Sequence, residues 1–212
     1  GDRFGLLRFD VATGQVTDRL FIEQGQELSI YHIAPSSNAN VIWLATNRGL
    51  LAFNVSTLES EEVFNVSAVG NKAIIIGIEE DKFGRVWLAT EKGLIVVNPA
   101  NGETRHIQAE LNNPDRLGSN ALSSMAKDRD GNLWIGAIEL GGLAKLNPGT
   151  RIFELLDYEP NSPQSIIHNQ IWHTFADSKN LLWLSTHEGL DRLNISTREI
   201  THYQPITGQK NT

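Results

Sequence analysis

The segment Asn132-Leu133-Trp134-Ile135-Gly136-Ala137 decides the fold, because close copies of it return three more times along the chain. The other copies are Val41-Ile42-Trp43-Leu44-Ala45-Thr46, Arg85-Val86-Trp87-Leu88-Ala89-Thr90 and Leu181-Leu182-Trp183-Leu184-Ser185-Thr186. A Gly-Leu pair follows each copy, at Gly49-Leu50, Gly93-Leu94, Gly142-Leu143 and Gly189-Leu190. The tryptophans recur every 44 to 49 residues. A period in the mid-forties with four short strands in each repeat is typical of a β-propeller blade.

The last full repeat reads as four short strands separated by turns. The strand-like runs cover residues 171–176, 181–186, 190–194 and 199–203. Polar residues and glycine fill the turns between them, and no segment keeps a helical period. The sequence therefore predicts an all-β fold, a β-propeller fragment with four four-stranded antiparallel blades. These blades are expected at about residues 28–66, 73–108, 120–158 and 169–204.

A half repeat opens the chain. Residues 5–10 match the third strand of the last repeat and residues 16–21 match its fourth, which predicts a half blade over residues 5–21. The tail at 204–212 is short and broken by proline and glycine, so it does not supply the two missing strands. We therefore expect residues 1–212 to be a single β-propeller segment of a longer protein. The remaining blades of that protein, or self-association, would cover its terminal apolar faces.

Composition excludes several classes of function. The chain has 212 residues, 40% hydrophobic and 20% charged, as in an ordinary soluble domain. The net charge of −7 and the lack of a basic stretch argue against a nucleic-acid partner. With no cysteine there is no disulfide, thiolate metal site or cysteine nucleophile. No apolar run is long enough for this segment to insert into a membrane, and the chain opens Gly1-Asp2-Arg3-Phe4, without the charged head and apolar run of a signal peptide.

One repeat carries a longer motif, Met125-Ala126-Lys127-Asp128-Arg129-Asp130-Gly131-Asn132-Leu133-Trp134-Ile135-Gly136, which continues to Gly141-Gly142-Leu143. The stretch Ile78-Glu79-Glu80-Asp81-Lys82-Phe83-Gly84-Arg85-Val86-Trp87 follows the same pattern. These residues resemble the two-component regulator propeller repeat, and the resemblance extends over nearly the whole chain. The first full repeat departs from the pattern at residues 35–40, where we expect only the local turn type to change.

The resemblance implies a function as well as a fold. It implies a periplasmic sensory segment of a membrane-bound bacterial signalling protein, with a histidine kinase or diguanylate cyclase as the output domain. Its ligand would be an unknown small molecule or oligosaccharide. Two alternatives stay open: a propeller-fold enzyme of the lyase or glycosidase kind, and a constitutive protein-interaction scaffold. Because no acid, base or nucleophile set converges in the sequence, we expect this fragment not to be an enzyme.

The repeated tryptophans and aspartates have a structural interpretation. A tryptophan in fixed phase is expected to be buried between blades, because aromatic rings supply large buried area. Asp81, Asp128 and Asp177 share one repeat position, where an aspartate starts a tight turn through bonds to backbone N–H groups. We prefer this interpretation to a calcium loop at Asp128, since the spacing does not fit one. The acidic pairs at 61–62 and 79–80 are expected to be solvated, and we expect no metal site or cofactor.

Residues that vary between repeats are the candidates for binding. In a propeller, the loops between the second and third strands and the connections between blades emerge at one face. The variable loops cover residues 47–48, 91–92, 138–141 and 187–188, and the connections cover 109–120 and 159–169. His32 and His173 fall at similar positions in first strands, beside the propeller axis, where side chains would line the central channel. The predicted ligand-binding residues are Arg48, Glu91, Lys92, His187, Glu188, His173, Trp172 and Tyr31.

Overall fold

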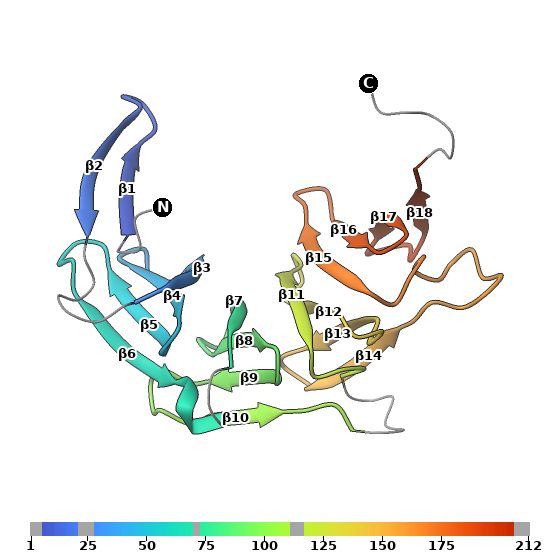
Figure 1. Ribbon diagram of the computed structural model, residues 1–212, viewed down its shortest axis with the longest axis horizontal. Helices are drawn as coiled ribbons and strands as arrows, with labels where there is room; N and C mark the ends of the chain where they lie inside the picture. Colours follow the sequence, from blue (N-terminus) through green and yellow to red (C-terminus); the bar gives the residue numbers. More distant parts are fainter. Residues whose placement is uncertain (1–5, 21–27, 70–72, 111–116, 206–212) are drawn as a thin grey trace. The chain divides into compact units, whose positions relative to one another are not determined.

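The computed structural model describes residues 6–20, 28–69, 73–110 and 117–205. These residues form 18 β-strands and one short 3₁₀ helix, Val66–Val69, with no α-helix in the described ranges. The strands make four four-stranded sheets and one two-stranded sheet, each with its strands paired in chain order (Figure 1). This confirms the predicted all-β fold of four blades and a half blade. Residues 5 and 21, at the ends of the predicted half blade, lie outside the described residues, as does most of the tail at 204–212.

The strand bounds follow the sequence repeat closely. The half blade contains β1 (Leu6–Asp10) and β2 (Gln15–Leu20), and the first blade contains β3 (Ile30–Pro35), β4 (Val41–Thr46), β5 (Gly49–Asn54) and β6 (Ser60–Asn65). The second blade contains β7 (Ile75–Glu80), β8 (Val86–Thr90), β9 (Gly93–Val97) and β10 (Thr104–Ile107). The third contains β11 (Leu122–Lys127), β12 (Leu133–Ala137), β13 (Leu143–Asn147) and β14 (Ile152–Leu156), and the fourth β15 (Ile171–Ala176), β16 (Leu181–Thr186), β17 (Gly189–Asn194) and β18 (Ile200–Tyr203).

The chain divides into two compact units, residues 1–88 with 96–105 and residues 89–95 with 106–212, so that the second blade contributes to both. In the first unit, Leu44, Leu51 and Phe53 of the first blade form a buried cluster. Leu6 of the half blade packs against this cluster, which attaches the two-stranded sheet to the first blade. Burial of such side chains is the main force that holds neighbouring repeats together.

In the second unit, the third and fourth blades share one core. Trp134 of β12 packs in a cluster with Leu182 and Leu184 of β16 and Leu193 of β17. In β16, Leu182 and Leu184 lie on the opposite side from Trp183, as strand geometry requires. Each blade therefore has a tryptophan face and a leucine face, and the tryptophan face of the third blade packs on the leucine face of the fourth.

Each indole N–H in the three regular repeats donates to the aspartate that starts the preceding turn. The Nε1-to-Oδ2 distances are 2.8 Å for Trp87 and Asp81, 2.9 Å for Trp134 and Asp128, and 3.2 Å for Trp183 and Asp177. The other carboxylate oxygen accepts backbone N–H groups of the turn, those of Asp130 and Asn132 in the case of Asp128. This confirms the turn interpretation and adds a second role that the sequence analysis missed.

The first blade lacks this aspartate and takes its carboxylate from the second blade. Trp43 Nε1 donates to Glu80 Oε2 over 2.7 Å. The Ser36 hydroxyl and the Ser37 backbone N–H donate to the same oxygen over 2.9 and 3.1 Å, and the Ser37 hydroxyl donates to Oε1. Glu80 is 8% exposed. The prediction that Glu80 is solvated is therefore wrong, and the irregular repeat changes the indole partner as well as the turn.

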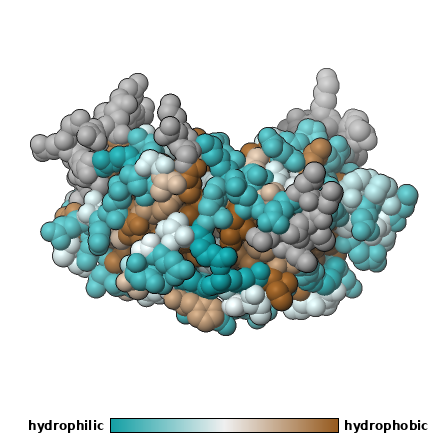
Figure 2. Space-filling view, turned by 90° about the horizontal axis from the view of Figure 1, so that it is seen from below, coloured by the Kyte–Doolittle hydropathy of each residue, from teal (hydrophilic) through white to brown (hydrophobic). Residues whose placement is uncertain are grey.

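The tryptophan face of the fourth blade is more exposed than those of the other blades. Trp43, Trp87 and Trp134 are buried, as predicted, whereas Trp183 is only partly buried and stacks on Tyr203 at a ring distance of 6.1 Å. Phe175, which pairs with Trp183 across the sheet, is 58% exposed. Figure 2, which labels no single residue, shows one face of the whole molecule, on which apolar residues in brown reach the surface between polar residues in teal.

We expect Trp134→Ala to lower the free energy of unfolding by about 3–5 kcal/mol, the usual cost of deleting a buried aromatic ring. Trp172→Ala is the matched control, because Trp172 is 50% exposed, and it should cost less than about 1 kcal/mol. Denaturant melts of both variants measure the difference. Equal losses would contradict the assignment of Trp134 to the core.

The pKa of Glu80 predicts a pH dependence. Burial by itself raises this pKa, but hydrogen bonds from Ser37, Trp43 and Ser36 outweigh burial and hold it below the ordinary value of 4.5. The stability that these bonds contribute is present above pH 4.5 and is lost as the pH falls through the folded-state pKa. Glu80→Gln should therefore cost about 1–3 kcal/mol at neutral pH and flatten the decline of stability below pH 4.5. Urea melts from pH 3 to pH 7, with Glu59→Gln as an exposed control, measure both effects; a Glu80→Gln profile parallel to that of the wild type would refute the assignment.

Candidate functional site

The turn between the second and third strands is built around a threonine. The Thr46 hydroxyl donates to the Gly49 carbonyl oxygen over 3.0 Å and accepts the Gly49 N–H over 3.1 Å. Thr90 and Thr186 donate in the same way to the carbonyl oxygens of Gly93 and Gly189, over 2.7 and 3.1 Å. The backbone N–H groups of Arg48, Lys92 and Glu188 donate to these hydroxyls. The turn backbone is thereby fixed, and the two residues inside it are free to vary.

The glycine of the Gly-Leu pair is required by a close approach of the fourth strand. A Cβ atom on Gly49 would lie 1.9 Å from the carbonyl oxygen of Phe64, and Gly49 has a φ of +146°. The same clash would occur between Gly189 and Tyr203, at 2.5 Å. The Gly-Leu repeat is therefore a requirement of the hairpin and carries no information on ligands.

The predicted loop residues lie at these turns. Glu91, Lys92, His187 and Glu188 are exposed, and Arg48 is half-buried. The His106 ring contacts the Lys92 carbonyl oxygen through Nε2 at 2.8 Å, so the fourth strand of the second blade supports its loop. Exposed side chains on a rigid turn are suited to contact a ligand with little loss of entropy.

Tyr31 and Trp172 occupy the same special position in their blades. The pairing of the first and second strands shifts by one residue between Ile30 and His32 in the first blade, and between Ile171 and His173 in the fourth. The extra residue of each bulge is the aromatic one, and both side chains are about half exposed. Bulges redirect a side chain out of the regular alternation of a strand, which is why they are frequent beside binding sites.

In the fourth blade the structure brings three predicted residues to one end of the sheet. Ile171, next to Trp172, pairs with Thr186, next to His187 and Glu188. The His187 N–H donates to the Gln170 carbonyl oxygen over 3.1 Å. In the first blade, Arg48 and Tyr31 share the corresponding end, because Ile30 pairs with Thr46.

His168 joins the fourth-blade group, although the sequence analysis did not select it. Its ring lies 5.3 Å from that of His187, centroid to centroid. Its Nδ1 accepts the Gln170 N–H over 2.9 Å, which places the proton of the neutral ring on Nε2. The fourth blade thus presents an indole, two imidazoles and a carboxylate. We call this set, Trp172, His168, His187 and Glu188, the loop-end cluster.

His173 lies beside this cluster but belongs to the strand. It pairs with Ser185 and is exposed, on the side of the sheet opposite to Thr174. His32 pairs with Ala45 at the same repeat position in the first blade, so the predicted equivalence of the two histidines is correct. A channel-lining role for either histidine stays a prediction.

The variable connections are anchored at specific points. Asn120 and Asn169 each accept the backbone N–H at the start of their connection, from Ala109 over 2.7 Å and from Tyr158 over 2.5 Å. Residues 111–116 of the first connection lie outside the described residues.

A buried aspartate fixes the second connection to its blade. Asp191 in β17 is fully buried and accepts the Ile167 N–H over 2.7 Å, and its other oxygen lies 2.7 Å from Nδ1 of His202. The sequence analysis missed this group, since the spacing of the three residues gives no motif. Asp157, which follows β14 just before the connection, has its pKa raised by burial and by the nearby charge of Glu159.

The charged groups of these surfaces do not form a metal centre. In the part of the chain that the structure describes, no three His, Asp or Glu side chains converge as a metal ion would require. The oxygens of Asp128 accept N–H groups from the turn, from Asn132 and from Trp134. The loop ends of the fourth blade present aromatic rings and hydrogen-bonding groups.

The motif around the third blade identifies the repeat. Residues 116–139 match the family model described as two component regulator propeller. The match confirms the resemblance predicted from the sequence, and it covers the aspartate, its turn and the tryptophan of the third blade. No curated protein matches the chain.

Solved structures of the same propeller fold extend over most of the chain. One is the extracellular domain of a protein from B. thetaiotaomicron described as a one component system, with 23% identity and a TM-score of 0.69 over 91% of this chain and 25% of that one. A second, from a B. thetaiotaomicron protein described as a hybrid two component system, has 19% identity and a TM-score of 0.62 over 82% of this chain and 24% of that one. Virginiamycin B lyase from Staphylococcus aureus has 13% identity and a TM-score of 0.67 over 95% of this chain and 63% of that one.

The chain spans about a quarter of the length of the first two of these proteins. At these identities the likeness shows the fold. None of the helical segments in the described ranges has the length and hydropathy that a bilayer crossing requires.

Proposed function

We propose that this chain is a sensory, ligand-binding segment in the extracytoplasmic part of a bacterial signalling protein. The observation that carries the proposal is the two component regulator propeller repeat at residues 116–139. The fold of the two extracellular domains from B. thetaiotaomicron supports it. In this proposal the protein is anchored in the inner membrane, the segment faces the periplasm, and a histidine kinase or diguanylate cyclase domain elsewhere in the protein receives the signal.

The loop-end cluster of the fourth blade is the proposed ligand site. A half-exposed indole at a bulge offers a flat apolar surface, and His168, His187 and Glu188 supply donors and acceptors at the same end of the blade. This combination suits a small polar molecule or an oligosaccharide, whose rings have both apolar faces and hydroxyl groups. His173 would extend the contact within the fourth blade. Tyr31 and Arg48, at the corresponding end of the first blade, form a candidate surface of their own.

We propose binding rather than catalysis as the activity of this segment. A propeller-fold enzyme is the competing proposal, and the likeness in fold to virginiamycin B lyase is the observation that favours it. Catalysis would need an acid or base held against a substrate. The loop-end cluster has two imidazoles and a carboxylate, so the distinction has to be made by assay: ligand recovered unchanged supports the sensor, and turnover supports the enzyme.

The tryptophan face of the fourth blade is the proposed contact with other sheets. Phe175 and Tyr203 are 58% and 42% exposed there, on either side of Trp183. The corresponding face of the third blade packs on a leucine face. We propose that a leucine face of the same kind covers the fourth blade, from the remaining blades of the protein or from a second copy.

A ligand screen tests the sensory proposal. Oligosaccharides and small metabolites that bind should raise the melting temperature, because a ligand that binds only the folded state stabilises it. Trp172→Ala and His187→Ala should abolish the shift. Phe83→Ala is the control, since Phe83 is an exposed aromatic at the turn between first and second strands, at the other end of its blade. A ligand whose shift survives both loop-end substitutions would place the site elsewhere.

A further inference from the structure

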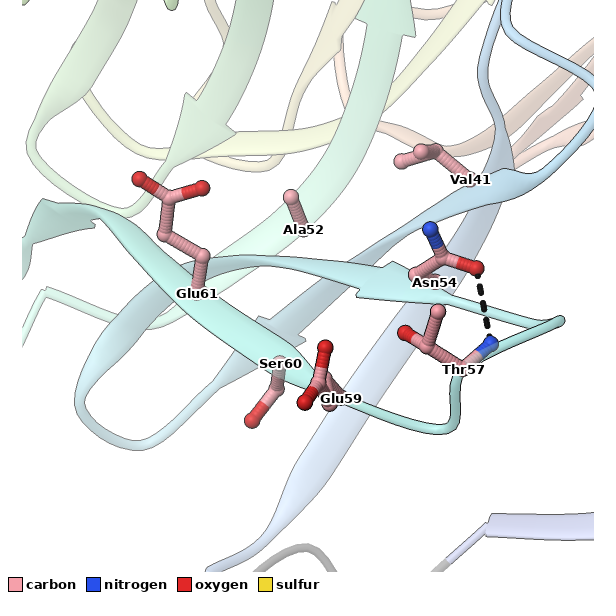
Figure 3. A pocket seen from close by; sticks show the side chains of 7 residues that line it. All are labelled: Val41, Ala52, Asn54, Thr57, Glu59, Ser60 and Glu61. Carbon is pink, nitrogen blue, oxygen red and sulfur yellow. Dashed lines mark hydrogen bonds between the residues drawn. The ribbon is translucent and has the colours of Figure 1, made fainter.

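A hollow of about 490 Å³ opens on the first blade, away from the loop ends (Figure 3). It is lined by Val41, Ala52, Asn54, Thr57, Glu59, Ser60 and Glu61. Its lining includes two acidic residues and several neutral polar residues, and contains no basic residue. The volume lies in the range of small-molecule sites. An acidic hollow of this size favours a cationic ligand.

The hollow lies along a row of side chains that cross the sheet. Trp43 pairs with Ala52, and Ala52 pairs with Glu61, so all three lie on the same face of the first blade. Figure 3 shows the Ala52 methyl group and the Glu61 carboxylate projecting to the same side from neighbouring strands. Ala52 leaves room at the centre of this row, because its side chain is a single methyl group.

The third blade has an equivalent row of side chains, and there two cationic side chains, Lys145 and Arg198, lie beside the tryptophan ring. Trp134 pairs with Lys145, and Lys145 pairs with Glu154. The Lys145 ammonium lies 5.3 Å from the Trp134 ring centroid. The guanidinium of Arg198, which comes from the turn between β17 and β18 of the next blade, donates to both Glu154 oxygens, over 2.8 and 2.6 Å. Its central carbon lies 5.6 Å from the Trp134 ring centroid.

The first blade keeps the carboxylate of this arrangement and lacks both cations. Ala52 stands in place of Lys145. In the second blade, Gly102 occupies the turn position that Arg198 occupies in the fourth blade. The backbone N–H of each residue donates over 2.8 Å to the carbonyl oxygen of the asparagine four residues before it. Both residues have a positive φ, +74° for Gly102 and +65° for Arg198. A Cβ atom on Gly102 would meet nothing within 4 Å. Glu61, the counterpart of Glu154, is exposed at the hollow, with Glu59 two residues away.

We propose that this hollow binds the guanidinium group of a ligand, which Glu61 holds as Glu154 holds Arg198. A planar guanidinium donates two parallel bonds to one carboxylate, and such charge-assisted pairs are stronger than neutral ones. Glu59 adds a second negative charge, and Thr57, Ser60 and Asn54 supply polar contacts to the rest of the molecule. The hollow shares no residue with the loop-end cluster, so this proposal does not depend on the proposed sensory role.

Calorimetric titration of the 212-residue chain with N-acetyl-arginine amide tests this proposal. The neutral ligand of the same shape, N-acetyl-citrulline amide, should bind at least about tenfold more weakly, because it loses the charge-assisted pair. Agmatine distinguishes the source of the group. Binding of agmatine as tight as that of the arginine derivative would indicate a free small molecule, and tighter binding of the arginine derivative would indicate a peptide side chain.

Variants assign the binding to the hollow. Glu61→Gln should weaken the arginine derivative by about tenfold or more. Glu62→Gln is the matched control, because Glu62 pairs with Leu51 and so points to the other face of the same strand. Gly102→Arg should fill the site from within and block binding, whereas Gly102→Ala, with the same backbone constraint, should leave binding intact.

Three results would overturn the proposal. They are the absence of saturable binding of the arginine derivative, equal affinity for the citrulline derivative, and unchanged affinity in both Glu61→Gln and Gly102→Arg. The melting temperature of each variant, measured alongside, separates loss of the site from loss of the fold.

Discussion

The hydrogen bond from the repeated tryptophan's indole N–H to a carboxylate is the constraint on which each blade depends. Burying a tryptophan stabilises the contact between blades, but an indole N–H without a partner would offset much of that gain. Asp128 supplies the indole with its partner and also forms the turn, because one carboxylate oxygen accepts the Trp134 N–H and the other accepts the backbone N–H groups of the turn. The first two strands of the blade are thereby joined at the point where the ring enters the core.

Much of this architecture could be predicted from the sequence, because the repeat of 44 to 49 residues marks each blade. The repeated tryptophans and Gly-Leu pairs gave the blades and strand limits, and the shared position of the aspartates gave the turn. The replacement of the usual aspartate by Glu80 as the partner of Trp43 could not be predicted from the repeat, since Glu80 is distant in sequence and belongs to another blade. A search for the missing indole acceptor at residues 35–40 would have indicated that some other residue supplies it.

The sequence predicted the residues of the candidate site only in part, because the pairing of the strands also determines which side chains lie together. Variation between repeats located the loop residues, but the pairing register decides which of them meet. The bulges that expose Tyr31 and Trp172 depend on the pairing of two strands, so neither residue alone signals them. The loop-end cluster needed His168, whose ring reaches His187 from the connection between blades. Likewise, the space beside Ala52 was recognised only by comparison with the equivalent row of the third blade, where Lys145 occupies the position. That comparison requires the cross-strand pairs.

Hydrogen exchange of the five indole N–H groups, followed by NMR on protein labelled in its tryptophans, tests the central claim most directly. Bonding to a buried carboxylate predicts slow exchange for Trp43, Trp87 and Trp134, and an intermediate rate for the half-buried Trp183. Trp172, half exposed at its bulge, should exchange fastest. Exchange of Trp87 and Trp134 as fast as that of Trp172 would contradict the account, because their N–H groups would then be bonded to water.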